Sequence, residues 1–229
     1  MGSSPFGTER QRRGYMQDYV KVYSKRFPNV FITVIPGHFM TPNSHINHYI
    51  DMTTMKSRQS EARATAEALA FDYVASTVVD TIICMDNSEV IGAYLADELT
   101  RHGIQSMNHH KTIYIMTPEY DSYGQMIFRD NVRKMIKDKH VLLLLASTTT
   151  GKTLRSAIEG IRYYGGEITG VSAIFSTVDT VAGMPIHRLF SKEDVPEYIT
   201  ASADRCPMCK EGMPIDAICN GFGYSTVNS

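Results

Sequence analysis

A run of hydroxyl-bearing residues interrupts the apolar patterns in the second half of the chain. It reads Ser147, Thr148, Thr149, Thr150, Gly151, Lys152 and Thr153, and it lies between an apolar run at 141–146 and a helical pattern at 152–164. A helix start offers N–H groups without helical partners and the positive end of the helix dipole, and both favour a bound anion. The hydroxyls add donors, the glycine lets the backbone approach a phosphate, and the lysine adds positive charge. The segment therefore predicts a phosphate-binding loop.

Two other interpretations of this loop stay open. The hydroxyl residues are also typical of the cap of an ordinary helix, although a cap needs only one of them. In addition, the pattern Ala146-x4-Gly151-Lys152-Thr153 satisfies a relaxed P-loop of nucleoside triphosphatases, with alanine in place of the first glycine. Under that interpretation Asp86, which follows an apolar run, is the candidate Walker acid, although it lies upstream of the loop.

Three cysteines near the end of the chain have the spacing of metal ligands. Cys206 and Cys209 form a C-x2-C pair, and Cys219 follows after nine residues. Thiolates at this spacing can share one Zn²⁺, and a tetrahedral structural site needs a fourth ligand. The candidates for that ligand are Cys84, a histidine between residues 38 and 48, and the pair His109–His110. The alternative is that the three cysteines are reduced and merely pack in the tail.

Secondary structure must position these groups, and from residue 78 onward strand and helix patterns alternate. Strands are predicted over 78–85, 112–116, 141–146, 168–175 and 186–190, and helices over 88–102, 129–137, 152–164 and 193–199. Continuous apolar strands alternating with helices predict an α/β fold with a mainly parallel, twisted sheet flanked by helices. Ligands of such sheets bind beyond the carboxyl ends of the strands, which is where residues 86–88 and 147–153 fall.

The first part of the chain gives weaker patterns. We expect a helix over 13–27, a strand over 30–35 that ends at Pro36-Gly37, a loop over 42–51 and a helix up to residue 73. The predicted organisation is an N-terminal helical extension at 1–29, an α/β core at 30–200 and a cysteine-containing tail at 201–229. The extension and the tail would form a small hood.

Composition limits the class of protein. The chain has 229 residues, of which 43% are hydrophobic and 21% charged, with a net charge of −1. These values predict a folded domain with small appendages, and no nucleic-acid partner because a basic excess is absent. No apolar run approaches the roughly 18 residues of a membrane span, so we expect no membrane partner. Four cysteines and a start unlike a signal peptide predict a cytoplasmic protein.

The order of motifs resembles a known family. A strand, then Thr149-Thr150-Gly151-x-Thr153, then a helix is similar to the phosphoribosyl pyrophosphate (PRPP) loop of type I phosphoribosyltransferases. Tyr49-Ile50-Asp51 resembles the entry segment of the orotate branch, Asp86-Asn87-Ser88 the pyrophosphate loop, and the stretch 163–171 the helix end and strand that follow the PRPP loop. Residues 118–124 fall where the mobile catalytic loop of the family lies. The resemblance extends over residues 30–190.

This resemblance implies a phosphoribosyltransferase-like protein. It would bind PRPP with Mg²⁺, or a nucleoside monophosphate, and transfer phosphoribose to a nitrogenous base. The implied ligand-binding residues are those of the two loops, 147–153 together with Asp86, Asn87 and Ser88. On the mobile loop the candidates for catalysis are Asp121 and Tyr123. We also expect a homodimer.

Three positions depart from the family pattern. The acidic pair that holds the ribose hydroxyls is replaced by Leu145 and Ala146. The Lys-x-His-Gly of the orotate branch is replaced by residues 121–124, Asp-Ser-Tyr-Gly, and the arginine after Val-Asp by Thr180. Two hypotheses follow. The chain either uses other acids on a different base, from the set Asp86, Glu89, Glu119 and Asp121, or it is a regulatory protein that binds its ligand without turnover.

Overall fold

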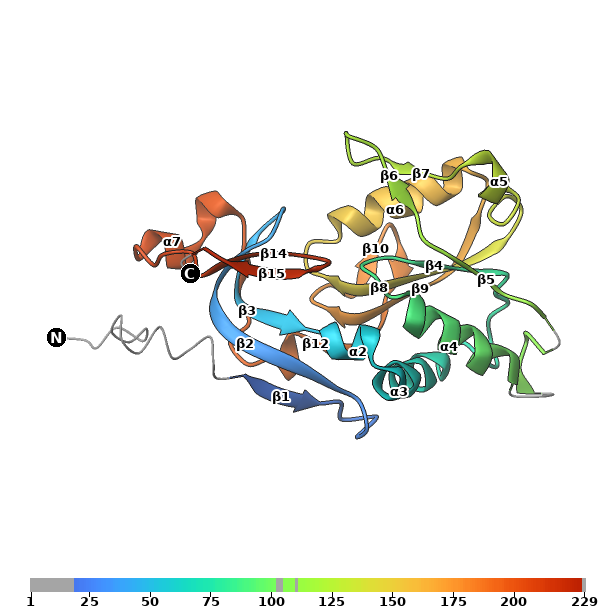
Figure 1. Cartoon of the computed structure of the whole chain (residues 1–229), viewed down its shortest axis with the longest axis horizontal. Coiled ribbons are helices and arrows are strands. Elements are labelled where there is room, and N and C mark those ends of the chain that lie inside the picture. Colours follow the sequence, from blue (N-terminus) through green and yellow to red (C-terminus); the bar gives the residue numbers. More distant parts are fainter. Residues whose placement is uncertain (1–18, 102–104, 110, 228–229) are drawn as a thin grey trace. The chain divides into compact units, whose positions relative to one another are not determined.

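The computed structural model describes residues 19–101, 105–109 and 111–227. The chain folds as two compact units, each with its own sheet (Figure 1). The described part of unit 1 contains residues 19–23, 31–53 and 192–227, and unit 2 contains residues 24–30 and 54–191. The predicted organisation differs from this division mainly at residues 31–53, which it assigned to the core and which belong here with the C-terminal segment.

Unit 2 is built on a five-stranded sheet in the order β12-β9-β8-β4-β5. Its strands are β4 (Thr81–Cys84), β5 (Tyr114–Met116), β8 (His140–Thr148), β9 (Glu167–Ser176) and β12 (His187–Ser191). Every pairing in this sheet is parallel, as the alternation of strand and helix patterns predicted. Two short antiparallel hairpins accompany it: β6 (Glu119–Tyr120) with β7 (Met126–Ile127), and β10 (Thr180–Val181) with β11 (Met184–Pro185).

Helices cover both faces of this sheet, which confirms the α/β fold (Figure 1). They are α2 (Thr53–Ser57), α3 (Gln59–Ala70), α4 (Glu89–Arg101), α5 (Asp130–Arg133) and α6 (Lys152–Tyr163). Alternate residues of β8 serve the two faces: Leu143 and Leu145 pack in the core beneath α6, and Leu142 and Leu144 point to the opposite face. None of the helices in the described ranges is long and apolar enough to cross a membrane.

Unit 1 has a mostly antiparallel sheet in the order β13-β3-β2-β14-β15, and β1 also pairs with β2. Its strands are β1 (Val20–Tyr23), β2 (Phe31–Met40), β3 (His45–Asp51), β13 (Thr200–Ala201), β14 (Ala217–Asn220) and β15 (Gly223–Thr226). Two 3₁₀ turns, η2 (Lys192–Asp194) and η3 (Ala203–Arg205), and the short helix α7 (Pro207–Lys210) complete it. Its core is Ile35, Phe39, Ile46, Ala217 and Cys219.

Four of the predicted elements are wrong. The helix over 13–27 is absent from its described part, because Val20–Tyr23 pairs antiparallel with Phe31–Val34 as β1. The strand expected to end at Pro36-Gly37 continues to Met40 through a bulge, and the predicted loop at 42–51 contains β3, whose pairing with β2 overrides its polar composition. The helix over 193–199 shrinks to the 3₁₀ turn η2. Residues 13–18 lie outside the described ranges.

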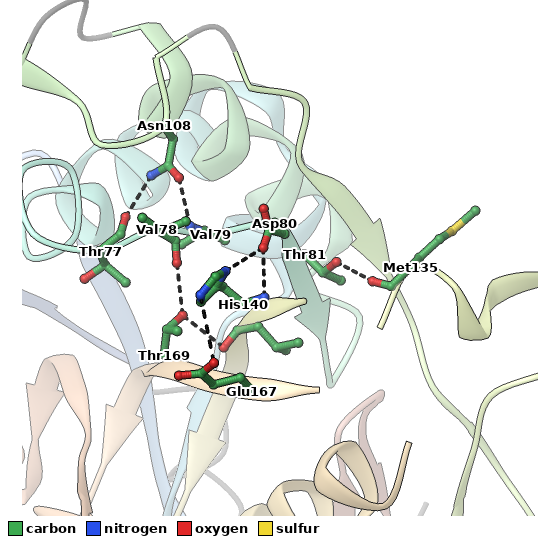
Figure 2. A network of polar contacts seen from close by, with 11 residues as sticks. Thr77, Val78, Val79, Asp80, Thr81, Asn108, Met135, His140, Glu167 and Thr169 are labelled. Atoms are coloured by element: carbon green, nitrogen blue, oxygen red, sulfur yellow. Dashed lines mark hydrogen bonds and ion pairs between the residues drawn. The ribbon is translucent and has the colours of Figure 1, made fainter. Parts of the chain in front are cut away.

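A polar network ties together the amino-terminal ends of β4, β8 and β9 (Figure 2). The carboxylate of Asp80 accepts the backbone N–H of His140 at 2.9 Å and contacts its Nδ1 at 2.7 Å. On the other side of the imidazole, Nε2 lies 3.9 Å from a carboxylate oxygen of Glu167. Burial alone would raise the pKa of Asp80, but the bonds from His140 outweigh it and lower that pKa. The two contacts between Asp80 and His140 therefore fix the point at which β8 enters the sheet.

Neighbouring residues complete this network. Asn108 is fully buried, accepts the N–H of Val79 at 2.8 Å and donates to the carbonyl of Thr77 at 2.9 Å. The hydroxyl of Thr169 donates to the carbonyl of Val78 at 3.2 Å (Figure 2). Backbone groups just before β4 are thus satisfied by side chains, which lets the strand start inside the fold.

We expect Asp80→Asn to lower the free energy of unfolding at pH 7 by about 1–2 kcal/mol, because a charge-assisted acceptor is lost. The pKa of Asp80 is depressed in the folded state. Its contribution is therefore complete above the unfolded value of about 3.9 and is lost as the pH falls through the folded value. Urea denaturation should thus show the variant and the wild type converging below about pH 4.

The exposed Asp138 provides a matched control for that measurement. Asp138→Asn should change the free energy of unfolding by less than about 0.5 kcal/mol at any pH. A gap between Asp80→Asn and the wild type that persists unchanged at low pH would contradict the role given to the carboxylate.

Candidate functional site

The hydroxyl-rich loop connects the end of β8 to the first turn of α6, as the sequence predicted. Gly151 is the N-cap of α6 and has a φ of 69°, in the left-handed region that favours glycine. No side chain caps this helix start by a hydrogen bond. Ser147, Thr150 and Thr153 are exposed, whereas Thr148 is buried. The loop therefore presents hydroxyls and helix-start N–H groups outward.

Thr177, directly after β9, sets the orientation of the loop backbone. Its N–H donates to the carbonyl of Thr148 at 3.1 Å, and its hydroxyl donates to the carbonyl of Thr149 at 2.6 Å. In a trans peptide the N–H points opposite to the carbonyl of the same peptide unit. Because both carbonyls face Thr177, the N–H groups of Thr149 and Thr150 face away from it. These two groups and the start of α6 form a concentration of donors suited to an anion.

The end of β8 carries no acidic side chain. Leu145 is 1% exposed and Ala146 is 5% exposed. Leu145 packs in the core beneath α6, so its position could not hold a solvent-facing carboxylate without rearrangement. The two positions that match the acidic pair of the family are thus part of the apolar core.

A carboxylate reaches the same strand end from the neighbouring strand. Asp86, just after β4, accepts hydrogen bonds from the backbone N–H groups of Ala146 and Ser147. Lys56 donates to the backbone carbonyl of Asp86 at 2.9 Å. Burial raises the pKa of Asp86, and the charge of Lys56 and the two N–H groups oppose that rise. Asp86 therefore braces the two strand ends against each other, a role that its place in the sequence did not reveal.

The rest of the predicted pyrophosphate loop has an unusual backbone. Asp86 and Asn87 both have positive φ angles, 57° and 59°, which aspartate and asparagine tolerate best among residues with a side chain. Asn87 is exposed. Ser88 is fully buried, with its hydroxyl 3.5 Å from the carbonyl of Leu144, so it faces the fold. Any ligand contact of Ser88 would therefore come from its backbone.

The hairpin of β6 and β7 occupies the place of the predicted mobile loop. One oxygen of Asp121 accepts the N–H groups of Tyr123 and Gln125, each at 2.8 Å, and thereby holds the turn. Tyr123 is 88% exposed. On β6, partial burial and the charge of Asp86 raise the pKa of Tyr120 to about 12. The predicted catalytic pair, Asp121 and Tyr123, lies at the tip of the hairpin.

The other acids considered from the sequence have partners of their own. Glu119 makes a two-pronged ion pair with Arg129, at 3.0 and 2.7 Å, which ties β6 to the start of α5. Glu89, in the first turn of α4, accepts the hydroxyl of Thr117 at 2.8 Å. Glu119 thus connects the hairpin to α5, and Glu89 connects the segment before β6 to α4.

A cation does reach the region where the orotate branch is expected to place an arginine. Position 180 is threonine, but Arg188 of β12 forms an ion pair with Asp179 and donates to the carbonyl of Val178 at 3.2 Å. Arg188 follows the Val-Asp pair by several residues, so a motif search confined to the next position misses it. Its charge is already paired with the carboxylate of Asp179.

In unit 1, two of the three predicted metal ligands come together with two histidines. Cys206 and Cys209 lie with His38 and His45 such that one donor atom from each falls within 4.8 Å of all the others. Cys219 does not belong to this group, since β14 directs it into the core with Ile35 and Phe39 and neighbouring side chains. The structure therefore places the C-x2-C pair beside two histidines of the segment 38–48 and places Cys219 outside this group.

The remaining candidates for a fourth ligand are not in this cluster. Cys84 is buried in β4 of unit 2, where burial raises the pKa of its thiol to about 12. His109 lies outside the cluster as well, and His110 falls outside the described residues.

Comparison with known proteins identifies relatives of the whole α/β region. The chain is 32% identical over 188 residues to an orotate phosphoribosyltransferase of Thermus thermophilus, a match that covers 81% of this chain and 93% of the relative. It is 28% identical over 188 residues to an orotate phosphoribosyltransferase of Chlorobium phaeobacteroides, covering 80% of this chain and 88% of the relative. No family model matches the chain.

Solved structures of similar proteins carry the same name. An orotate phosphoribosyltransferase of Mycobacterium tuberculosis aligns with a TM-score of 0.49 and 12% identity, over 72% of this chain and 93% of that one. One from Aeropyrum pernix aligns with a TM-score of 0.49 and 14% identity, over 79% of this chain and 93% of that one.

The matches cover most of the length of the relatives from Thermus and Chlorobium. The P-loop interpretation of residues 146–153 finds no support among these relatives. The chain belongs to the type I phosphoribosyltransferase family, in the orotate phosphoribosyltransferase branch.

Proposed function

We propose that unit 2 binds the 5-phosphate of a phosphoribosyl compound at residues 147–153, accepts PRPP, and transfers its phosphoribosyl group to a nitrogenous base. The observation that supports this most directly is the backbone of the loop, whose carbonyls are held by Thr177 while the N–H groups of Thr149 and Thr150 face outward. Membership of the phosphoribosyltransferase family supports the reaction class.

The residues of the chain would act mainly by positioning PRPP and the base relative to each other. The 5-phosphate would accept the N–H groups at the start of α6 and the hydroxyls of Thr150 and Thr153, both exposed. A base nitrogen then attacks C1 of the ribose, the bond from C1 to pyrophosphate breaks, and pyrophosphate leaves with the electron pair. Such a displacement depends on alignment and on stabilising the leaving charge more than on a strong base.

Mg²⁺ is the cation expected with PRPP. It would neutralise the pyrophosphate charge when bound, and the Asp86 carboxylate is the side chain suited to hold it, because a hard cation prefers carboxylate oxygens. Asp86 already accepts two N–H groups, but an ionised carboxylate has about four acceptor positions. The acceptor positions that remain free on Asp86 suit this carboxylate to hold the cation beside the pyrophosphate.

The burial of Leu145 and Ala146 favours a second candidate function, binding without turnover. In the phosphoribosyltransferases that this chain resembles, an acidic pair at these positions holds the ribose hydroxyls. Without it the ribose is less tightly oriented, and a protein with this loop could retain affinity for a ribose phosphate and lose alignment of C1. Pyrophosphate is released only if the phosphoribosyl group is transferred, so measuring its release distinguishes transfer from binding without turnover.

Thr150→Val should weaken binding of PRPP and of ribose 5-phosphate by roughly tenfold to a hundredfold, because one hydroxyl bond to a charged group contributes about 1.5–3 kcal/mol. Titration calorimetry on the full chain measures this directly. The matched control is Ser156→Ala, an exposed hydroxyl of α6 one turn beyond the loop. Equal affinities for wild type and Thr150→Val would exclude residues 147–153 as the phosphate site.

Asp121→Asn should leave transfer and PRPP binding nearly unchanged, because an asparagine oxygen can accept the same N–H groups at the turn. Asp121→Ala should open the hairpin and accelerate chymotryptic cleavage after Tyr123 at least severalfold. If Asp121→Asn keeps the protease resistance of the wild type but loses activity, then the carboxylate itself takes part in catalysis.

Orotate should be a poor acceptor. Position 180 is threonine, Arg188 is paired with Asp179, and Asp121 stands where the branch carries a lysine, so a carboxylate on the base meets no unpaired cation among these positions. We expect negligible orotidine monophosphate from orotate and PRPP at saturating Mg²⁺. Pyrophosphate release should be assayed in parallel with purine and other pyrimidine bases.

The two assays together decide between the candidates. Turnover of orotate within the ordinary enzyme range of about 1–10³ per second would contradict the prediction on orotate. Pyrophosphate release with another base would support transfer. PRPP binding without release for any base would support the binding function.

A further inference from the structure

Four side chains of unit 1 aim donor atoms at one another. His38 Nε2 lies 3.0 Å from His45 Nδ1, 3.6 Å from Cys206 Sγ and 3.7 Å from Cys209 Sγ. Cys209 Sγ lies 3.3 Å from His45 Nδ1. His38 and Cys206 are fully buried, His45 is buried and Cys209 is exposed. All four donor atoms lie within 4.8 Å of one another.

These separations match the edges of a metal-centred tetrahedron. With zinc bonds of about 2.0–2.1 Å to nitrogen and 2.3 Å to sulfur, tetrahedral angles place neighbouring donor atoms about 3.3–3.8 Å apart. The observed nitrogen–sulfur distances fall in this range, and the nitrogen–nitrogen distance is slightly below it. The geometry points to a Zn²⁺ site formed by His38, His45, Cys206 and Cys209.

The hairpin of β2 and β3 supplies both histidines. Thr41 and Ser44 close its turn, with the Thr41 N–H donating to the Ser44 carbonyl at 2.8 Å and the Ser44 N–H to the Thr41 hydroxyl at 2.9 Å. The register between the strands shifts between Pro36 and Phe39, so Gly37 and His38 form a bulge. A bulge redirects a side chain relative to the regular strand. It brings His38 towards His45, which follows the turn on β3.

Gly37 is required for this bulge. A Cβ atom at this position would lie 2.8 Å from the ring of Phe39 and 3.2 Å from a carboxylate oxygen of Asp216. That carboxylate accepts the His38 N–H at 2.7 Å, and the Asp216 N–H donates to the His38 carbonyl at 2.8 Å. The backbone of His38 is thus held on both sides by one residue.

The contacts of His38 also fix its tautomer. Its Nδ1 lies 3.1 Å from the carbonyl oxygens of both Met213 and Pro214. Because a carbonyl oxygen only accepts, Nδ1 must carry the proton, and in the neutral ring Nε2 presents its lone pair to the cluster. A backbone carbonyl that orients an imidazole in this way is the usual outer partner of a metal-bound histidine.

The two cysteines come from a single tight turn. Cys206 is the N-cap of α7, and its sulfur accepts the N–H of Cys209 at 3.5 Å. Proline at 207 starts the helix, and the Lys210 N–H donates to the Cys206 carbonyl at 3.2 Å. The N–H of Cys209 thereby helps to hold the sulfur of Cys206 in place within the turn. The turn therefore presents both sulfurs on one side, ready to face the histidines.

The composition of the site indicates its role and its metal. Two sulfurs and two nitrogens in a tetrahedron are typical of zinc, and four protein ligands leave no open position for a reactant. The site is therefore structural. It would link the β2–β3 hairpin to the segment that follows β13, two parts of unit 1 separated by most of the chain. The inference is independent of the phosphate loop and of any transfer activity.

Elemental analysis of the full chain, purified without a histidine tag and without chelator, should find about one zinc per chain. Replacement by Co²⁺ should give the intense visible absorption of a tetrahedral cobalt–thiolate site together with thiolate-to-metal charge transfer. This second readout uses the wild type, so it does not depend on a variant that folds.

Cys209→Ser is the most informative variant because Cys209 is the exposed ligand. It should lower zinc affinity at least tenfold, and roughly a hundredfold if the serine does not coordinate, when measured by competition with a chromogenic chelator. Cys219→Ser is the matched control: it changes a cysteine of the same unit outside the cluster and should keep about one zinc per chain.

Three results would overturn the site. The first is a chain that contains no zinc as purified and takes up none when refolded with the metal. The second is a Cys206–Cys209 disulfide in protein kept under reducing conditions. The third is a Cys219→Ser variant that loses zinc while Cys209→Ser keeps it. Iron in place of zinc, with the absorption of an iron–sulfur centre, would overturn the assignment of the metal.

Discussion

Strand β8 is paired with β4 along one edge and with β9 along the other, and apolar side chains cover both of its faces. A strand enclosed in this way can carry polar side chains only where it ends. The parallel pairing then decides which ends meet: Cys84 is in register with Leu144, and Thr148 with Ser176. The loops after the three strands are neighbours because of that register. The outward N–H groups of the loop at 147–153, the contacts of Asp86 with the end of β8 and the bonds from Thr177 all depend on this register.

The sequence predicted unit 2 better than unit 1, and the physical reason is the range of the interactions. The central strands β4, β8 and β9 of unit 2 are apolar enough to be recognised individually, and the helices α4 and α6 show their own periodicity. In unit 1 the pairing comes from distant segments. β3 is largely polar, with histidine and asparagine among its residues, and forms because β2 and β13 pair with it. β2 crosses a proline and a glycine that would end an isolated strand, because the bulge absorbs them.

The same distinction between local patterns and long-range contacts applies to the candidate sites. The hydroxyl-rich loop is a local pattern, so residues 147–153 could be singled out as a candidate phosphate site from their types and order. Asp86 was assigned to the pyrophosphate loop, but its bonds to Ala146 and Ser147 cross from one strand to the next and leave no trace in sequence spacing. Arg188 lies beside Asp179 because its strand, β12, pairs with β9, the strand that precedes Asp179. Likewise the C-x2-C pair was evident, whereas the choice of His38 and His45 over Cys219 depends on a bulge and on the direction in which β14 faces.

Unit 1 is discontinuous along the chain, since residues 31–53 pair with strands that begin only after residue 199. This has a consequence for synthesis on the ribosome, where the amino-terminal part emerges first. Residues 54–191 can complete their parallel sheet from what has already left the exit tunnel. The β2–β3 hairpin, in contrast, must wait until β13 and β14 have been translated before these strands can join it. During that interval unpaired strand edges of the hairpin are exposed to solvent and to chaperones, and the segment after residue 199 covers them only later.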